Sequence, residues 1–376
     1  MRLLFLFSFF LLQSLLICAQ DLNQSYIANP QQDSLFPGSL NLRISNNNFL
    51  RNNEYFNQYT VGITYFGSQI QPELAYTLSQ NTRLSVGCFL RYYYGKDKFN
   101  TTIPVFRFEY LPLKSLKITF GQLNGLLGHN LLEPVYTTDN YFTRNPENGI
   151  ELEYNGTRLQ SSAWISWDHF ILPGDNSKEE ITAGMNSIWI LLNKKKGQSL
   201  SVHLQGIIHH FGGQVDNSDS PLQTRLNLAP GIEYNFVPRS AHSPDITFAS
   251  YLIQSVDQSG NGTLPYKKGW ASYSYAVLHY KPVRLVGSFF HGEYYFAPLG
   301  DYLFQSVSEI NQWYQGDSRN LVNGKFLFDK NIGAGISMGI RFEAYYEPSG
   351  SQLEYSYGMN IKADADWLLF RNRKKK

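Results

Sequence analysis

Hydrophobic and polar residues alternate with a period of two along most of the chain. In residues 83–94 the even positions are Leu84, Val86, Cys88, Leu90, Tyr92 and Tyr94, whereas the odd positions include Arg83 and Arg91. Side chains on a β-strand point alternately to opposite faces, so this segment predicts a strand with one apolar and one polar face. The same alternation recurs at 150–154, 225–236, 334–346 and 353–369.

Applied to the whole chain, the pattern predicts about sixteen strands, within a range of about fourteen to eighteen. The predicted strands are 58–66, 69–78, 82–95, 99–110, 115–121, 147–155, 157–167, 180–193, 198–209, 224–236, 244–254, 269–281, 283–295, 323–330, 334–346 and 352–370. Segment 38–46 is a further candidate, and residues 299–322 have room for one more hairpin. Short turns such as Asn155-Gly156, a strong hairpin signal, alternate with long polar connections such as 122–146 and 296–322.

Two architectures use strands of this kind. A soluble sandwich buries the apolar face against a second sheet, whereas a membrane barrel turns that face to lipid and keeps the polar face in the lumen. Segments of about ten residues suit a tilted crossing of the bilayer. Aromatic residues gather at their ends, as in Tyr92/Tyr94 and Trp367/Phe370, where headgroups are expected. We therefore expect an all-β, antiparallel, up-and-down transmembrane β-barrel with short periplasmic turns and long outer loops.

The composition also favours a membrane barrel over a soluble domain. Aromatic residues make up 15% of the 376 residues and charged residues 16%, whereas an ordinary soluble domain has about 25% charged residues. Disorder is excluded by the amount of apolar surface. Past residue 17, no apolar run reaches the about 18 residues that a spanning helix needs. The net charge of +2 comes from basic residues after Phe370, so it does not indicate a nucleic-acid surface.

The N-terminus predicts an export signal. Met1 and Arg2 begin it, the apolar stretch 3–17 follows, and Ala19 offers a cleavage site. Removal of Cys18 leaves Cys88 as the one cysteine, so no disulfide is expected. The expected organisation is a cleaved signal peptide at 1–19, a periplasmic N-terminal segment at 20–57, the transmembrane β-barrel at 58–370 and a basic periplasmic tail at 371–376.

The whole pattern resembles the porin class of Gram-negative outer-membrane β-barrels. Phe370 matches the aromatic residue that usually ends the last strand of that class, although residues 371–376 continue beyond it. The stretch from Phe120 to Ile150 loosely resembles the strand–loop–strand unit of substrate-selective porins. The resemblance implies a place in the cell outer membrane and passive diffusion of small hydrophilic solutes. It also implies outer-membrane lipid and those solutes as partners, and a second copy or another protein at the outer loops, with no nucleic acid and no cofactor.

By the same resemblance, the third outer loop, 122–146, is expected to fold into the lumen and narrow it. The expected constriction consists of Arg83, Arg91, Arg107, Lys117, Glu133, Asp139 and Arg144. Glu133 and Asp139 opposite Arg91 and Arg107 would create a transverse field that selects among solutes. The alternative is that these charges form ion pairs that only brace the wall, because interior charges need partners.

Two histidine motifs could serve other chemistry. His209 and His210 are adjacent and point to opposite faces, with no third ligand nearby in the sequence, so no metal site is expected. Ser201 and His203 share a face and could act as nucleophile and base. A lipid-cleaving barrel would need such a pair facing the membrane with a third orienting residue. Ser201 and His203 are expected to face the lumen, so the chain is not expected to be an enzyme.

Three functions stay open on this evidence. The first is a passive channel, the second is a non-conducting scaffold or subunit of a secretion or adhesion assembly, and the third is a barrel lipid hydrolase. Loop 296–322 contains Tyr302 and Phe304, which suit either a plugged lumen or partner binding. Analogy at the level of the fold favours the channel.

Overall fold

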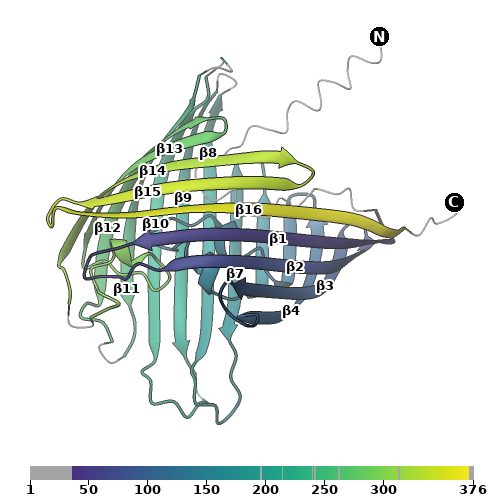
Figure 1. Cartoon of the computed structure of the whole chain (residues 1–376), viewed down its shortest axis with the longest axis horizontal. Coiled ribbons are helices and arrows are strands. Elements are labelled where there is room, and N and C mark those ends of the chain that lie inside the picture. Colours follow the sequence, from purple (N-terminus) through teal and green to yellow (C-terminus); the bar gives the residue numbers. More distant parts are fainter. Residues whose placement is uncertain are drawn as a thin grey trace.

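The computed structural model describes residues 36–371, except 195, 196, 214, 239, 241, 242, 261, 262, 312 and 313. These residues form one closed antiparallel barrel of sixteen strands, in which β16 pairs with β1 (Figure 1). The predicted fold class is therefore confirmed. Within the described part, no helix is long and apolar enough to cross a membrane. The predicted signal peptide and the residues after Arg371 lie outside the described residues.

The strands differ in length from 7 residues in β5 to 20 in β16. In chain order they are β1 (Ser39–Glu54), β2 (Thr64–Ser79), β3 (Thr82–Tyr93), β4 (Thr101–Leu113), β5 (Leu116–Gln122), β6 (Asn148–Asn155), β7 (Leu159–His169), β8 (Glu179–Lys194), β9 (Gln198–Gly212), β10 (Gln223–Phe236), β11 (Asp245–Asp257), β12 (Lys268–Tyr280), β13 (Val283–Glu293), β14 (Ser318–Gly333), β15 (Ile336–Glu347) and β16 (Gln352–Arg371). A tilted crossing needs about 9–11 residues, so the longer strands extend beyond the hydrocarbon layer.

The alternation seen in the sequence decides which side chains face lipid. On β3, Val86 is 46% exposed, whereas Arg91 on the other face is 0% exposed. On β15, Phe342 is exposed and Glu343 is buried. The polar face is thus the interior of the molecule, the reverse of a soluble protein. Because the sheet closes on itself, each of the sixteen described strands pairs with a neighbour on both sides, as a membrane-spanning sheet requires.

The barrel begins earlier in the sequence than predicted. The expected strands 58–66 and 69–78 give way to the single strand β2, and the open candidate 38–46 belongs to β1. Two differences therefore cancel, and the number of strands stays at sixteen. Residues 39–54 form part of the wall and not part of a periplasmic segment at 20–57.

Asparagines obscure the strand pattern of β1. After Leu42 and Ile44, the next positions of the same parity are Asn46 and Asn48, so the apolar face is interrupted. Pairing with two neighbours compensates for the weak pattern, since β1 is in register with β2 and with β16 along almost its whole length.

The connections fall into two classes, as predicted. Turns such as 80–81, 114–115 and 281–282 join strands at one end. The opposite end carries the connections 55–63, 94–100, 123–147, 170–178, 213–222, 258–267, 294–317 and 348–351. In outer-membrane barrels the short turns are periplasmic and the long loops are outside, which orients this barrel.

The two longest outer loops, 123–147 and 294–317, pack inside the barrel. They contain the short helices η1 (Leu126–His129), α1 (Asn140–Thr143) and η2 (Tyr302–Phe304). Val135 of the first loop and Phe304 of the second are 1% and 0% exposed, and both belong to one apolar cluster with wall residues such as Tyr273. The hydrophobic core of this protein therefore lies in the lumen.

Candidate functional site

Polar side chains of the wall hold loop 123–147 across the lumen. Gln205 of β9 donates to the carbonyl of Asn130 (3.1 Å) and accepts from the N–H of Leu132 (2.9 Å). Arg91 of β3 donates from Nη1 to the carbonyl of Thr143 (2.9 Å). Because buried peptide groups need hydrogen-bond partners, these contacts fix the backbone of the loop between two parts of the wall. The loop thus folds inward, as the resemblance to porins implied.

The two acidic loop residues contact a part of the wall that the sequence analysis did not single out. Glu133 Oε2 lies 2.5 Å from Lys325 Nζ, and Asp139 Oδ1 lies 2.8 Å from Arg51 Nε. Both bases also contact Glu343, at 3.0 Å from Arg51 Nη1 and 2.9 Å from Lys325 Nζ. These five charged residues form one group, which we call the lumen network; Arg51, Lys325 and Glu343 are buried, and Glu133 and Asp139 are half-buried.

The predicted wall bases have other partners. Arg83 lies 3.8 Å from Glu109, and Arg107 lies 3.8 Å from Glu73. Lys117 contacts Glu153, and Arg91 donates to carbonyl groups of the loop. Neither Glu133 nor Asp139 faces Arg91 or Arg107 in these contacts. The seven residues of the expected constriction are therefore divided among separate contacts, and the transverse field stays a prediction.

Sequence reasoning missed two members of the lumen network, Arg51 and Lys325. Arg51 lies in the part of β1 where asparagines hide the alternation. Lys325 falls on a predicted strand, but its two carboxylate partners come from a loop and from the next strand. Alternation along the strand indicates that the side chain of Lys325 points inward. It does not indicate which residue of another strand or loop that side chain contacts.

Loop 294–317 packs directly on loop 123–147. The N–H of Thr137 donates to the carbonyl of Leu299 (2.8 Å), and the hydroxyl of Tyr295 donates to the carbonyl of Pro134 (2.7 Å). Asp301 is buried beside them, and burial together with nearby carboxylates raises its pKa well above the usual range. The two loops together fill the side of the lumen bordered by β10–β15.

A buried histidine ties η1 to the wall. His129 Nε2 lies 2.5 Å from Glu147 Oε2, and Nδ1 lies 3.5 Å from Glu151 Oε1. The imidazole stacks on Trp164 with ring centroids 3.5 Å apart. Burial alone would lower the pKa of His129, but the two carboxylates outweigh it and raise the pKa to about 9. His129 is therefore a cation at neutral pH.

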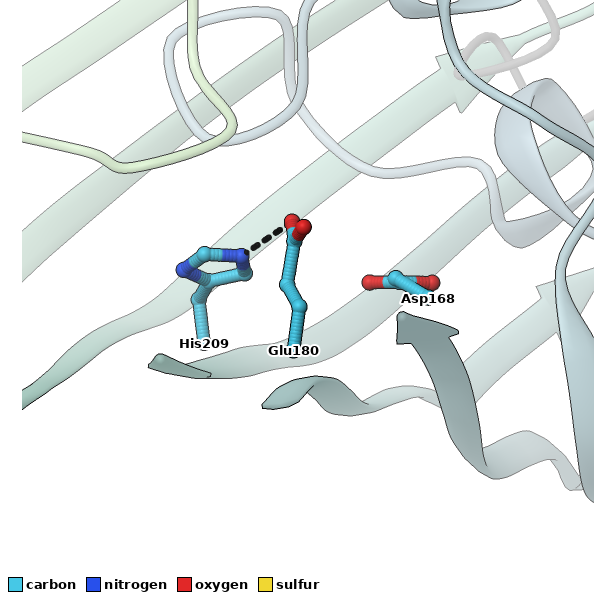
Figure 2. Close-up of side chains that lie close together, drawn as sticks. All are labelled: Asp168, Glu180 and His209. Carbon is cyan, nitrogen blue, oxygen red and sulfur yellow. Dashed lines mark hydrogen bonds and ion pairs between the residues drawn. The ribbon is translucent and has the colours of Figure 1, made fainter. Parts of the chain in front are cut away.

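A second charged group lies at the outer ends of β7, β8 and β9 (Figure 2). Ligand atoms of Asp168, Glu180 and His209 lie within 4.8 Å of one another, which is close enough for a metal ion. The sequence analysis placed no further ligand near His209, because the two carboxylates come from other strands. Arg144 Nη2 lies 2.8 Å from Asp168 Oδ2 and 3.0 Å from Glu180 Oε1. The guanidinium thus supplies the positive charge and anchors the loop.

Ser201 and His203 form a hydrogen-bonded pair. Ser201 Oγ lies 2.8 Å from His203 Nε2, and the hydroxyl of Tyr251 lies 3.0 Å from Nδ1. Both residues of the pair are buried, at 6% and 0% exposure, on the lumenal face as predicted. The lumenal position separates the pair from lipid, and Ser201 also lies near the start of β9, at the end of the barrel with the short turns.

Another histidine faces lipid near the outer rim. His291 Nδ1 lies 2.9 Å from Asn320 Oδ1, and Nε2 lies 3.8 Å from Glu293 Oε1. The indole of Trp270 donates to Glu293 (3.1 Å) and packs edge-on against the imidazole. Ser272 lies directly opposite His291 in the register of β12 and β13. We call these five residues the His291 cluster.

Two further histidines have hydroxyl partners near the same rim. His169 Nε2 lies 2.8 Å from Ser177 Oγ, and His210 Nδ1 lies 2.9 Å from Thr224 Oγ1. The alternation along single strands does not reveal these contacts or the His291 cluster, because the partners come from different strands or from a loop. Only the register of the barrel brings them together.

Comparison with known proteins gives a family and a fold. A family model described as "Lipid A 3'-O-deacylase-type" matches residues 29–372. Among curated proteins, none matches the sequence. The family description is that of an enzyme, so the prediction that the chain is not an enzyme is wrong.

Solved structures with the same fold are outer-membrane proteins. OprD from Pseudomonas aeruginosa is 9% identical, with a TM-score of 0.51 over 88% of this chain and 95% of OprD. OccK2 from Pseudomonas aeruginosa, solved with glucuronate, is 10% identical, with a TM-score of 0.51 over 89% and 100%. A loop-deletion mutant of OmpT from Vibrio cholerae is 10% identical, with a TM-score of 0.50 over 87% and 100%. The predicted porin-like fold and the location in the outer membrane are confirmed.

Proposed function

Because the chain belongs to the lipid A 3'-O-deacylase-type family, we propose that it hydrolyses an acyl ester of lipid A, or of a similar lipid, at the outer rim of the barrel. The family match takes in all sixteen strands, and it is the observation that carries this proposal. In the reaction, water releases a fatty acid from a sugar hydroxyl. The chain must supply a nucleophile, a base that accepts its proton, and access to lipid.

The position of the ester narrows the choice of residues. An ester of a membrane lipid lies at headgroup level, and its acyl chains lie in the hydrocarbon layer. Ser201 and His203 do not suit this substrate, because both are buried in the lumen. His169 and Ser177 have the required position, but among the described residues no third side chain hydrogen-bonds that ring. His291 faces lipid, lies near the outer rim and has an orienting partner.

The geometry of the His291 cluster supports a serine–histidine mechanism. When Asn320 Oδ1 accepts the Nδ1–H of His291, the Nε2 atom is free to accept a proton. Ser272 is directly opposite His291 in the register, and the Cβ atoms of such a pair are about 4.5–5.5 Å apart, so we take Ser272 as the nucleophile. Glu293 lies 3.8 Å from Nε2 and stabilises the cation that forms.

The hydrolysis needs no reactant other than the lipid and water. Ser272 Oγ attacks the ester carbonyl while its proton passes to His291. The C–O bond to the sugar breaks, and the sugar oxygen takes that proton. Water then attacks the acyl-serine, with His291 again accepting and returning a proton, and the fatty acid leaves.

Release of fatty acid from lipid A by the purified full-length barrel in detergent micelles tests the proposal. Mass spectrometry is expected to show loss of one acyl chain with the wild type. Ser272→Ala and His291→Ala are expected to lower the rate about 10²–10⁴-fold, the usual contribution of an acid–base group. Ser177→Ala and Ser201→Ala are the matched controls and are expected to retain activity.

Two results would count against this proposal, each in a different way. A wild-type barrel that releases no fatty acid contradicts the function itself. Loss of activity in Ser177→Ala or Ser201→Ala, with activity kept in His291→Ala, contradicts the choice of residues. It would place the active site at the serine whose replacement abolishes activity.

A second candidate function is a restricted channel for small hydrophilic solutes. It is favoured by the lumen network, in which charges of both signs connect an inward loop to the wall. Single-channel recording in planar bilayers tests it. Current steps that change in size when Arg51 is replaced support a conducting lumen. No steps from either the wild type or the Arg51→Ala variant contradict it.

A further inference from the structure

The lipid-facing wall over β9–β14 is hollowed where its side chains are small. Ala276, Gly287, Gly324 and Ala344 lie in one cross-strand row, and each is the register partner of the next. Ala276 and Gly287 border a groove of about 620 Å³, and Gly324 and Ala344 continue the row beyond its lining. Its lining extends from Ser274 and Phe289 on β12 and β13 to Leu200 and Tyr234 on β9 and β10.

The glycines leave room that the protein does not fill. A Cβ atom added to Gly287 or to Gly324 would meet no other atom within 4 Å. Phe248 is the register partner of Ala276 and ends the row on β11, whereas Phe289 lies one lipid-facing position along β13 from Gly287; the two are 56% and 47% exposed. The groove is thus open to the lipid and is bordered by large side chains.

The groove begins next to the His291 cluster. Along β13, the lipid-facing positions from the outer rim inward are His291, Phe289 and Gly287, so the groove starts one lipid-facing position below the imidazole. On β12 the same step leads from Ser272 to Ser274, which lines the groove. An acyl chain in the groove would therefore have its ester end at the level of His291.

We infer that this groove holds the acyl chain of the lipid whose ester reaches the His291 cluster. The inference rests on the proposed function and adds the place on the wall where the acyl chain of the substrate lies. Acyl chains surround this face of the barrel, and the groove is continuous with that lipid-facing surface. Water is absent from this layer, so selectivity comes from close packing and not from the hydrophobic effect. The small residues provide that packing, since they admit a chain beside two aromatic rings.

Gly287→Leu tests the groove directly. The added side chain enters open space, so the barrel is expected to fold, and it occupies the place of the acyl chain. Hydrolysis of a long-chain lipid A is expected to fall about tenfold, since on the order of ten carbon contacts are lost. Hydrolysis of a short-chain ester is expected to change little. Ala163→Leu, on the lipid-facing side of β7, is the matched control and is expected to leave both rates unchanged.

A binding measurement separates this inference from the proposed function. Vesicles containing a lipid with a photoactivatable acyl chain are used with the His291→Ala variant, in which hydrolysis plays no part. Cross-links are expected to concentrate on β12 and β13 and to fall several-fold when Gly287→Leu is added. Cross-links spread evenly over the lipid-facing wall overturn the groove even where the wild type hydrolyses lipid A. Loss of a dimer in native mass spectra of Gly287→Leu, without loss of cross-links, means that a second copy occupies the groove and also overturns it.

Discussion

Arg51 of β1 and Asp139 of loop 123–147 form an ion pair in the lumen, with 2.8 Å between Nε and Oδ1. Arg51 is 1% exposed and also contacts Glu343 at 3.0 Å. Burial raises the pKa of Asp139, and the guanidinium opposes that shift. One side chain of the first strand therefore connects the wall to the loop that crosses the barrel, and its removal leaves two carboxylates without that partner.

Arg51→Ala is expected to destabilise the barrel by about 3–5 kcal/mol, the usual cost of breaking a buried ion pair. Thermal unfolding in detergent, followed by circular dichroism, measures the loss. Arg43→Ala is the matched control, because Arg43 lies on the same strand and face and pairs with Asp366 at 2.8 Å, but is 23% exposed. The control is expected to cost about 1 kcal/mol or less. Equal losses in the two variants would mean that Arg51 is not an anchor.

The contact between His129 and Glu147 predicts that loop 123–147 loosens at high pH. The pKa of His129 is raised from 6.5 to about 9 in the folded protein. Its contribution to stability is therefore complete below pH 6.5 and is lost as the pH rises through 9. Over that range the loss amounts to about 3 kcal/mol at most. Limited proteolysis of the loop is expected to speed up between pH 7 and pH 10.

Other titrating groups near the loop call for a control. Glu147, Glu151 and the hydroxyl of Tyr136 face the same site, and Asp301 in the adjoining loop also has a raised pKa. His129→Gln removes the cation and keeps a hydrogen-bonding side chain. Its proteolysis rate is expected to be higher at pH 7 and to vary less with pH. A variant that keeps the wild-type pH profile would assign the effect to Asp301.

The sequence predicted the wall of this barrel better than its interior. Alternation along β3 and β15 was enough to place Arg91 and Glu343 inside, because the period of a strand is a local property. β1 was less certain, since asparagines occupy several of its apolar positions, and its strand character depends on pairing with β16 from the far end of the chain.

The candidate sites could not be predicted in the same way. Glu133 lies 192 residues from Lys325 in the sequence, and their contact depends on how a loop folds across the lumen. Ser272 and His291 are opposed only because of the register of a hairpin. Spacing along one strand revealed Ser201 and His203, which are local, and missed the arrangements that depend on more than one strand.

The contacts of Arg144 indicate how Asp168, Glu180 and His209 respond to metal ions (Figure 2). Its guanidinium contacts Asp168 and Glu180, whose oxygens and the nearby His209 could otherwise coordinate a cation. Arg144→Ala is expected to gain binding of Mn²⁺ or Zn²⁺, seen by calorimetry and by a higher melting temperature with the ion. The wild type is expected to show neither change. Adding His209→Gln should weaken the gain, and a wild type that binds equally well would contradict this account.

The contact between Asn320 and His291 predicts how replacement of Asn320 changes the rate of hydrolysis. Its Oδ1 atom lies 2.9 Å from His291 Nδ1, so it orients the imidazole without contacting the lipid ester. Asn320→Ala is expected to lower kcat for lipid A about tenfold and to leave KM nearly unchanged, since the ring loses its fixed orientation. Asn320→Asp should recover activity and shift the acidic limb of the pH–rate profile upward, because a carboxylate beside the ring favours its protonated form. A purely structural role would give an equal loss in both variants and no shift of the profile.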